Sequence, residues 1–122
     1  GETALIIAAD QGQADAVKTL IDQGAALDAK DRQGATALIW AVGQGRSNVV
    51  EALLAAGADP NAQDVDGISA LMEAVTTNHN ELIEPLMSHR ADPTLKDGEG
   101  RTAGDIAKQK GNDEALGLLA GG

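Results

Sequence analysis

Few residues of this sequence could carry out catalysis or hold a metal ion. The chain contains no cysteine, and its two histidines, His79 and His89, are ten residues apart. A catalytic nucleophile needs a nearby base with an orienting partner, and paired zinc-binding histidines on one helix lie four residues apart. We therefore expect that the protein is not an enzyme, that it holds no metal ion, and that His79 is a structural residue in a turn.

One stretch partly matches a calcium-binding loop. Asp64, Asp66, Gly67 and Glu73 would stand at its third, fifth, sixth and twelfth positions. The first ligand position is Ala62, which has no side-chain oxygen, and the aspartate and glycine recur elsewhere at a spacing of 33 residues. The paired glycines of the chain also lack the third glycine and the preceding strand of a dinucleotide site. We therefore predict neither a calcium site nor a cofactor.

The charge of the chain favours a protein partner over a nucleic acid. Its 19 acidic and 9 basic residues give a formal net charge of −10. A nucleic-acid surface needs clustered Lys and Arg, so we predict no nucleic-acid binding and expect a partner protein with a basic face. No apolar run approaches the roughly 18 residues of a membrane helix, so no membrane partner is predicted. The compartment stays unknown, because a chain without cysteine is compatible with either redox environment.

The chain is organised by a repeat of 33 residues. Each unit has a glycine, a hydroxyl residue two positions later, and an alanine directly after the hydroxyl. The glycines are Gly1, Gly34, Gly67 and Gly100, and the hydroxyl residues are Thr3, Thr36, Ser69 and Thr102. Turn residues recur as well, at Gly12, Gly45, Asn78 and Gly111, and at Gly24, Gly57 and Arg90. We therefore expect one domain over 1–122, with repeats at approximately 1–30, 31–63, 64–96 and 97–122.

Each repeat reads as two short helices and a loop. The hydroxyl residue is an N-cap, and the helix that it starts, for instance Ala37 to Val42, ends at the Gly45 position. A second helix follows, capped in three repeats by Ser47, Asn80 and Asp113. The chain then turns at Gly57 and runs into an extended finger. Small apolar residues and a single aromatic residue, Trp40, suit such thin layers of helices.

This pattern resembles the ankyrin repeat family, for which a 33-residue period and a Thr-Pro-Leu-His motif are typical. The matching stretches are Thr3-Ala4-Leu5-Ile6, Thr36-Ala37-Leu38-Ile39, Ser69-Ala70-Leu71-Met72 and Thr102-Ala103-Gly104-Asp105, with alanine in place of proline. The resemblance covers essentially the whole chain. It implies an all-α repeat solenoid of stacked antiparallel helix pairs with β-hairpin or finger loops. It also implies protein binding through a concave face formed by the fingers and the first helices.

Some residues depart from the pattern. Pro85 lies within the second helix of the third repeat, so we expect a kink or a late helix start there. Arg90 replaces a turn glycine, which places a side chain in a left-handed conformation. At the first repeat, the apolar residues Val17, Leu20 and Ile21 lack a polar cover, which indicates a fragment or a self-associating end of an otherwise monomeric protein. The polar residues from Lys108 to Glu114 are typical of a C-terminal cap.

The register names the candidate partner-binding residues, which are those expected on the concave face. They are Arg32, Gln33, Ile39, Gln44, Val65, Asp66, Ile68, Met72, Thr76, Thr77, Glu99, Arg101 and Lys110, with Asp10, Gln11, Ala35 and Gln109 beside them. Trp40 is expected to pack between neighbouring repeats instead. Two functions remain open: a protein-binding module, such as an inhibitor or adaptor, or a structural segment of a longer or designed solenoid with no partner of its own.

Overall fold

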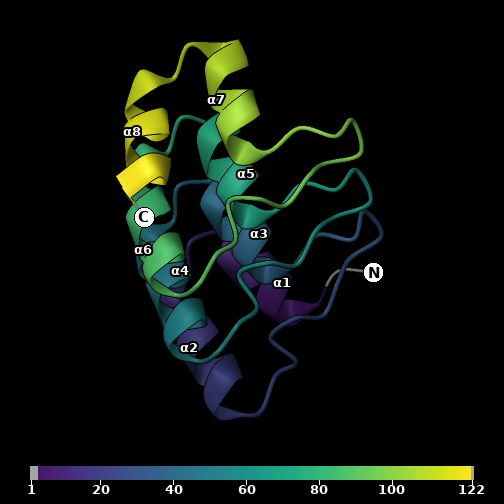
Figure 1. Cartoon of the computed structure of the whole chain (residues 1–122). Coiled ribbons are helices and arrows are strands. Elements are labelled where there is room, and N and C mark those ends of the chain that lie inside the picture. The colour runs from purple at the N-terminus through teal and green to yellow at the C-terminus, as the bar shows by residue number, and fades with distance from the viewer. Residues whose placement is uncertain (1–2, 122) are drawn as a thin grey trace.

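The computed structural model describes residues 3–121 as four stacked pairs of helices (Figure 1). The first helices of the pairs are α1 (Ala4–Asp10), α3 (Ala37–Gly43), α5 (Ala70–Thr76) and α7 (Ala103–Lys110). The second helices are α2 (Ala14–Asp22), α4 (Ser47–Ala55), α6 (Ile83–Ser88) and α8 (Asp113–Gly121), and a 3-10 helix, η1 (Asn80–Leu82), precedes α6. The predicted all-α repeat solenoid is confirmed.

The hydroxyl residues start the first helices as predicted. The side-chain oxygens of Thr3 and Thr36 accept hydrogen bonds from the backbone N–H three residues later, at 3.1 and 3.3 Å. Ser69 does the same for α5 at 3.3 Å. Thr102 does so for α7 at 3.2 Å, and the Asp105 side chain accepts in return from the Thr102 N–H. These bonds satisfy backbone donors that have no partner within the helix.

The second helices begin differently from the prediction. Ser47 and Asn80 are the first residues of α4 and η1, and the preceding Arg46 and His79 stand at the N-caps without a side-chain capping bond. The prediction that Ser47 and Asn80 cap these helices is wrong, because main-chain hydrogen bonds close the reversal and lead directly into the helix. In the fourth repeat the capping bond is accepted by the Asn112 side chain, one residue earlier than predicted.

Between residues 3 and 121, two residues other than glycine adopt the left-handed backbone conformation, Asn78 with a φ of 62° and Arg90 with a φ of 71°. This conformation costs about 1 kcal/mol for a residue with a Cβ, and asparagine tolerates it best. In the next repeat the short Asn112 lies beside this turn: its side chain donates to the Val75 carbonyl oxygen at 3.4 Å, and both asparagines line one hollow. At the equivalent turn of the second repeat, a Cβ on Gly45 would lie 2.7 Å from Nε2 of His79.

Pro85 delays the second helix of the third repeat, as predicted. The segment begins as η1 and continues as α6 only from Ile83, which makes Pro85 the third residue of α6. The first four N–H groups of a helix have no intrahelical partner, so the missing N–H of proline removes no hydrogen bond here. The late helix start is therefore confirmed, and it places proline where a helix tolerates it.

The helices lie in two rows (Figure 1). α1, α3, α5 and α7 contact one another in this order, and the second helices pack against them as the other row. Alanines let the first helices approach closely: Ala8, Ala41, Ala74 and Ala107 are at most 5% exposed. The core is therefore a thin continuous layer that extends from one repeat to the next, as the small side chains predicted.

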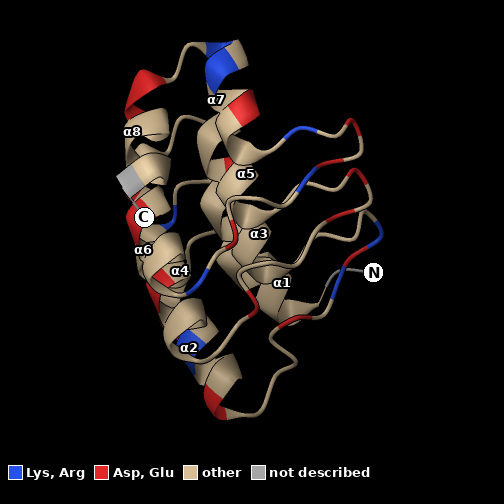
Figure 2. Cartoon of the chain, in the orientation of Figure 1, with Lys and Arg blue, Asp and Glu red and all other residues tan. Residues whose placement is uncertain are grey.

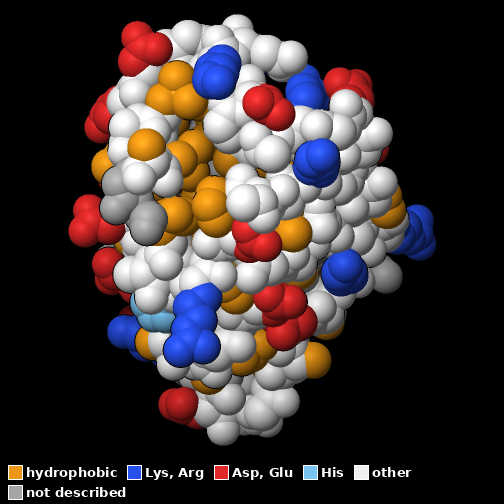
Figure 3. Space-filling model, viewed as in Figure 1, with side chains coloured by type: hydrophobic (Ala, Val, Ile, Leu, Met, Phe, Trp, Pro, Cys, Tyr) orange, Lys and Arg blue, Asp and Glu red, His pale blue; other side chains and the backbone are white. Residues whose placement is uncertain are grey.

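One residue at the first end of the stack differs from the expectation. Val17 is fully buried, so its assignment to an uncovered outer face is wrong; it packs into the core that α2 shares with its neighbours. Leu20 and Ile21 are half-buried, and self-association through them stays a prediction. At the other end, Figure 3 shows apolar side chains beside α8, where Leu116 and Leu119 are half-buried. None of the helices described in residues 3–121 is long and apolar enough to cross a bilayer.

Candidate functional site

Three finger loops project from the helix stack, to the right in Figure 1. We number them by the repeat to which they belong, as the second, third and fourth fingers. Each tip is closed by one aspartate, Asp31, Asp64 or Asp97, whose Oδ1 accepts two backbone N–H hydrogen bonds at 2.9 Å. In the part of the chain that the structure describes, the fingers contain no regular strand and only an isolated antiparallel bridge between Gln63 and Ser69. The predicted finger loops are therefore tight turns on extended arms.

Neighbouring fingers are joined by few hydrogen bonds. The Val65 N–H donates to the Gln33 carbonyl oxygen at 2.9 Å, and the Gly98 N–H donates to the Asp66 carbonyl oxygen at 2.8 Å. The side chain of Gln63 adds one bond to the main chain of the fourth finger. These bonds hold the three tips in register as one row.

The tips share a backbone but carry different side chains. The second finger exposes Arg32 and Gln33, the third exposes Val65 and Asp66, and the fourth exposes Glu99. Val65 is 72% exposed. Figure 2 shows acidic and basic residues together in the fingers, whereas acidic residues predominate along the outer side of the second helices. These five predicted finger residues are thus accessible, and they form a row of mixed charge around one apolar side chain.

Arg101 is held within its own finger. Its guanidinium donates to Asp97 Oδ2 from Nε at 3.0 Å and from a terminal nitrogen at 2.9 Å, and it also donates to the Gln109 side chain at 3.0 Å. The backbone hydrogen bond from Arg101, that from Glu99 and the guanidinium together outweigh burial and lower the pKa of Asp97. Arg101 therefore stabilises the finger, and its contact with a partner stays a prediction.

Ile39 and Met72 do not lie on the exposed concave surface. They are 5% and 1% exposed, and the prediction that they point outward is wrong. Their side chains lie on first helices that pack against the neighbouring first helices, which cover them. Ala35 is buried as well, and Ile68 is half-buried. Among the described finger residues, Val65 is therefore the one large apolar side chain open to a partner.

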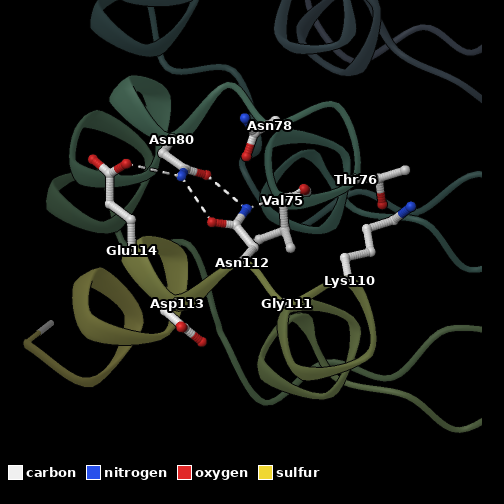
Figure 4. A pocket seen from close by; sticks show the side chains of 9 residues that line it. All are labelled: Val75, Thr76, Asn78, Asn80, Lys110, Gly111, Asn112, Asp113 and Glu114. Carbon is white, nitrogen blue, oxygen red and sulfur yellow. Dashed lines mark hydrogen bonds between the residues drawn. The ribbon is translucent and has the colours of Figure 1, made fainter.

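The remaining predicted residues lie at the ends of the first helices, where they form separate groups. Gln44 Nε2 donates to Asp10 Oδ1 at 2.8 Å, which joins the first and second repeats. Thr77 is half-buried, and its hydroxyl donates to a main-chain carbonyl one turn earlier at 2.7 Å. Thr76 and Lys110 are exposed and line a hollow of about 750 Å³ beside the turns of the third and fourth repeats (Figure 4).

A polar pair closes one side of that larger hollow. Asn80 and Asn112 exchange side-chain hydrogen bonds at 2.8 and 2.9 Å, and Asn80 also donates to Glu114 at 3.2 Å, as Figure 4 shows. No buried side-chain polar atom between residues 3 and 121 lacks a partner. Earlier repeats cover the equivalent turn with the longer Arg46 and His79. The pair therefore links the third and fourth repeats, and Asn112 stands where the earlier repeats have a larger side chain.

A smaller hollow of about 210 Å³ lies between the second and third repeats, and we call it the Trp40 hollow. Its lining consists of Gln33, Ala35, Ile39, Trp40, Gly43, Gln44, Asp64 and Glu73. Trp40 packs against the core as predicted, but it is half-buried, and its indole Nε1–H donates to Asp31 at 2.8 Å. Burial raises the pKa of Asp31, yet the hydrogen bonds from Trp40 and two backbone groups outweigh it and lower the pKa overall. The hollow thus brings together three predicted residues, Gln33, Ile39 and Gln44.

Glu73 is one of four residues of this hollow, with Trp40, Gly43 and Asp64, that the repeat pattern did not single out as binding residues. It is half-buried, and burial together with the nearby charge of Asp64 raises its pKa, against the opposite effect of His79. The other repeats have an apolar residue at the equivalent position, Ile7, Trp40 or Ile106. A charged residue at this position is the sequence feature by which Glu73 could have been identified. Within residues 3–121, no group of three or more histidine, aspartate or glutamate side chains could hold a metal ion.

Comparison with known families gives two matches. A family model described as ankyrin repeats in three copies matches residues 1–64, and one described as an ankyrin repeat matches residues 66–98. A search among curated proteins found no significant match. The first match alone covers more than half of the chain.

Proposed function

The chain belongs to the ankyrin repeat family, and on that premise we propose that it binds a partner protein through the row of finger tips and the adjoining ends of the first helices. Ankyrin repeats are generally protein–protein interaction modules. The partner that this surface favours has a basic face, because the chain carries a formal net charge of −10. Complementary charge speeds association and excludes wrong partners.

One observation carries the proposal: the tips repeat a rigid backbone while their exposed side chains differ. Asp31, Asp64 and Asp97 each fix the tip with the same two hydrogen bonds. An exposed side chain on such a tip does not pack in the core, so its type can vary to suit a partner without loss of stability. Val65 supports this interpretation, because a large apolar residue that is 72% exposed gains from burial only when a partner covers it.

The test is affinity capture from the source lysate, followed by mass spectrometry, with two matched variants. Arg32→Glu with Asp66→Lys reverses two charges in the finger row and leaves the net charge unchanged. Lys18→Glu with Glu51→Lys makes the same exchange at exposed positions of α2 and α4. We expect the wild type and the helix variant to capture one stoichiometric protein and the finger variant to lose most of it, with equal melting temperatures.

Two results would count against the proposal. Equal capture by both variants would contradict the assignment of the binding face to the finger row. Repeated absence of any stoichiometric prey would favour the alternative that the chain is a structural segment of a longer or designed solenoid.

A further inference from the structure

The aspartate that closes each finger has a second carboxylate oxygen, Oδ2, whose partner differs between repeats. In the second repeat the indole N–H of Trp40 donates to Asp31 Oδ2 at 2.8 Å. In the fourth repeat the guanidinium of Arg101 donates to Asp97 Oδ2 at 3.0 and 2.9 Å. In the third repeat the two hydrogen bonds to Asp64 reach Oδ1, and no donor among residues 3–121 reaches Oδ2. The same scaffold thus has one oxygen without a hydrogen-bond donor among the described residues.

Asp64 of the third finger and Glu73 of α5 both line the Trp40 hollow, so two carboxyl groups border it. The aromatic side chain of Trp40 lines it as well. The two carboxyl groups repel each other, since Asp64 contributes to the raised pKa of Glu73. The ion pairs between described residues involve Arg101 alone, so neither carboxyl group is ion-paired with a lysine or arginine of this part of the chain, and His79 only partly offsets the raised pKa of Glu73.

We propose that the Trp40 hollow receives the side chain of an arginine from the partner protein, an inference that rests on the proposed function. A guanidinium is planar, stacks on an indole face and donates to carboxylates through several N–H groups. It would give Asp64 the contact that Arg101 gives Asp97. A volume of about 210 Å³ equals roughly seven water molecules of about 30 Å³ each, which is room for a guanidinium and its adjoining methylenes.

Other cations fit the hollow less well. A lysine ammonium is a compact, strongly hydrated charge that offers no plane to stack on Trp40. A hard metal ion such as Ca²⁺ takes six to eight oxygen ligands, and the hollow has two carboxylates. The combination of an aromatic wall with two separate carboxylates therefore selects for arginine.

The test needs no knowledge of the partner, because the probe is N-acetyl-L-argininamide. Trp40 is the only tryptophan of the chain, so its indole N–H gives a single signal in a ¹H–¹⁵N NMR spectrum. Titration of the probe should shift this signal saturably, with an affinity in roughly the millimolar range. N-acetyl-L-citrullinamide has the same shape without the charge and should produce no saturable shift. N-acetyl-L-lysinamide should bind more weakly than the arginine probe.

Matched variants assign the effect to the two carboxylates. Asp64→Asn with Glu73→Gln removes both charges and keeps an acceptor at Asp64 Oδ1, so the finger turn is retained. We expect at least about a tenfold weaker affinity for the arginine probe, by analogy with the loss of a charged partner in a partly buried site. Glu51→Gln removes a charge from an exposed position of α4 that does not line the hollow, and it should change the affinity less than about twofold.

The titrations separate this inference from the broader function. Equal shifts with the arginine and citrulline probes would overturn the inference, and so would an unchanged affinity in the double variant. Neither result would touch the finger row, which is tested separately by capture of the partner. The wild-type titration with the three probes tests the inference even if the double variant is unstable.

Discussion

The finger tips of the third and fourth repeats have the same backbone but different surroundings. Gly67 and Gly100 both have a φ of 79°. A Cβ on Gly67 would lie 2.7 Å from the backbone nitrogen of Gly98 and 2.8 Å from Asp97 Cα, whereas a Cβ on Gly100 would meet no atom within 4 Å. Glycine therefore meets two requirements in the third finger, a left-handed backbone and close approach of the next finger, and only the first of these in the fourth finger.

This difference separates two contributions to stability that a repeat usually combines. One belongs to the dihedral angles of a single repeat, and the other belongs to the packing of a repeat against the next one. In a stack of repeats, both kinds of energy add up along the chain. Positions that share a φ but differ in their neighbours make it possible to measure the two contributions separately.

The largest effect is expected for Gly67→Ala, compared with Gly100→Ala. Both variants place a Cβ in the left-handed region, at a cost of about 1 kcal/mol or more. Gly67→Ala must also displace the backbone of the fourth finger, which adds about 1–3 kcal/mol of overpacking. The free energy of unfolding in urea should therefore fall by roughly 2–4 kcal/mol for Gly67→Ala and by about 1 kcal/mol for Gly100→Ala. Equal losses of unfolding free energy in the two variants would show that the close approach of the fourth finger makes no contribution at Gly67.

A smaller effect is expected at the turn that follows the second helix, at Arg90 in the third repeat and Gly57 in the second. Arg90→Gly removes the cost of a left-handed side chain and should raise the free energy of unfolding by about 1 kcal/mol. Gly57→Ala is the mirror experiment, because a Cβ there would meet no atom within 4 Å. It should lower the free energy of unfolding by a similar amount.

These two variants are designed to measure the cost of the left-handed backbone separately from the packing against the next repeat. Urea unfolding of both variants gives the measurement. A loss of stability in Arg90→Gly would show that the arginine side chain makes a stabilising contact that outweighs its backbone conformation.

The smallest effect on stability is expected for Glu73, a charged side chain of the third repeat that lies against Gly43 of the second repeat. Glu73 Oε1 lies 3.1 Å from the Cβ position of Gly43, so the third repeat covers the second with a carboxyl group whose pKa is raised by burial. A raised pKa means that the folded state prefers protonated Glu73, and its ionised form lowers stability. Glu73→Gln should therefore stabilise the protein by about 0.5 kcal/mol at neutral pH. This gain should vanish as the pH falls below about 4.

Asp31 provides the control of opposite sign. Its pKa is lowered in the folded state, so the ionised form stabilises the protein above its unfolded pKa, and this stability is lost as the pH falls through the folded pKa. Asp31→Asn should therefore destabilise the protein at neutral pH, with a loss that shrinks in acid. Thermal unfolding across the pH range would show both trends. A gain for Glu73→Gln that grows in acid would contradict the sign.

Local features of the fold were predictable from the sequence. Thr36 and Ser69 mark helix starts because an N-cap acts within three residues, and Pro85 delays α6 through its own missing N–H. The start of α4 was placed one residue late, because Ser47 looks like an N-cap while the main-chain bonds of the reversal make it the first helical residue.

The binding surface was harder to predict than the helices. The repeat shows that Ile39 and Met72 are equivalent, but it does not say how closely the neighbouring helix covers them, and the structure buries both. The Trp40 hollow combines side chains of two different repeats. Glu73 is unusual in the sequence as a charged residue at an apolar repeat position, but only the structure shows that it lines the same hollow as Asp64.

The sparse bonding between the fingers has a mechanical consequence. The rows of helices share a continuous apolar contact, whereas the third and fourth fingers are joined by the Gly98 N–H bond to Asp66 and the side-chain bond from Gln63 to the main chain. Breaking two such bonds costs about 1–3 kcal/mol. We therefore expect the stack to be stiffer along its helices than along the row of finger tips. Its curvature can adjust to the shape of a bound surface while the helices stay packed.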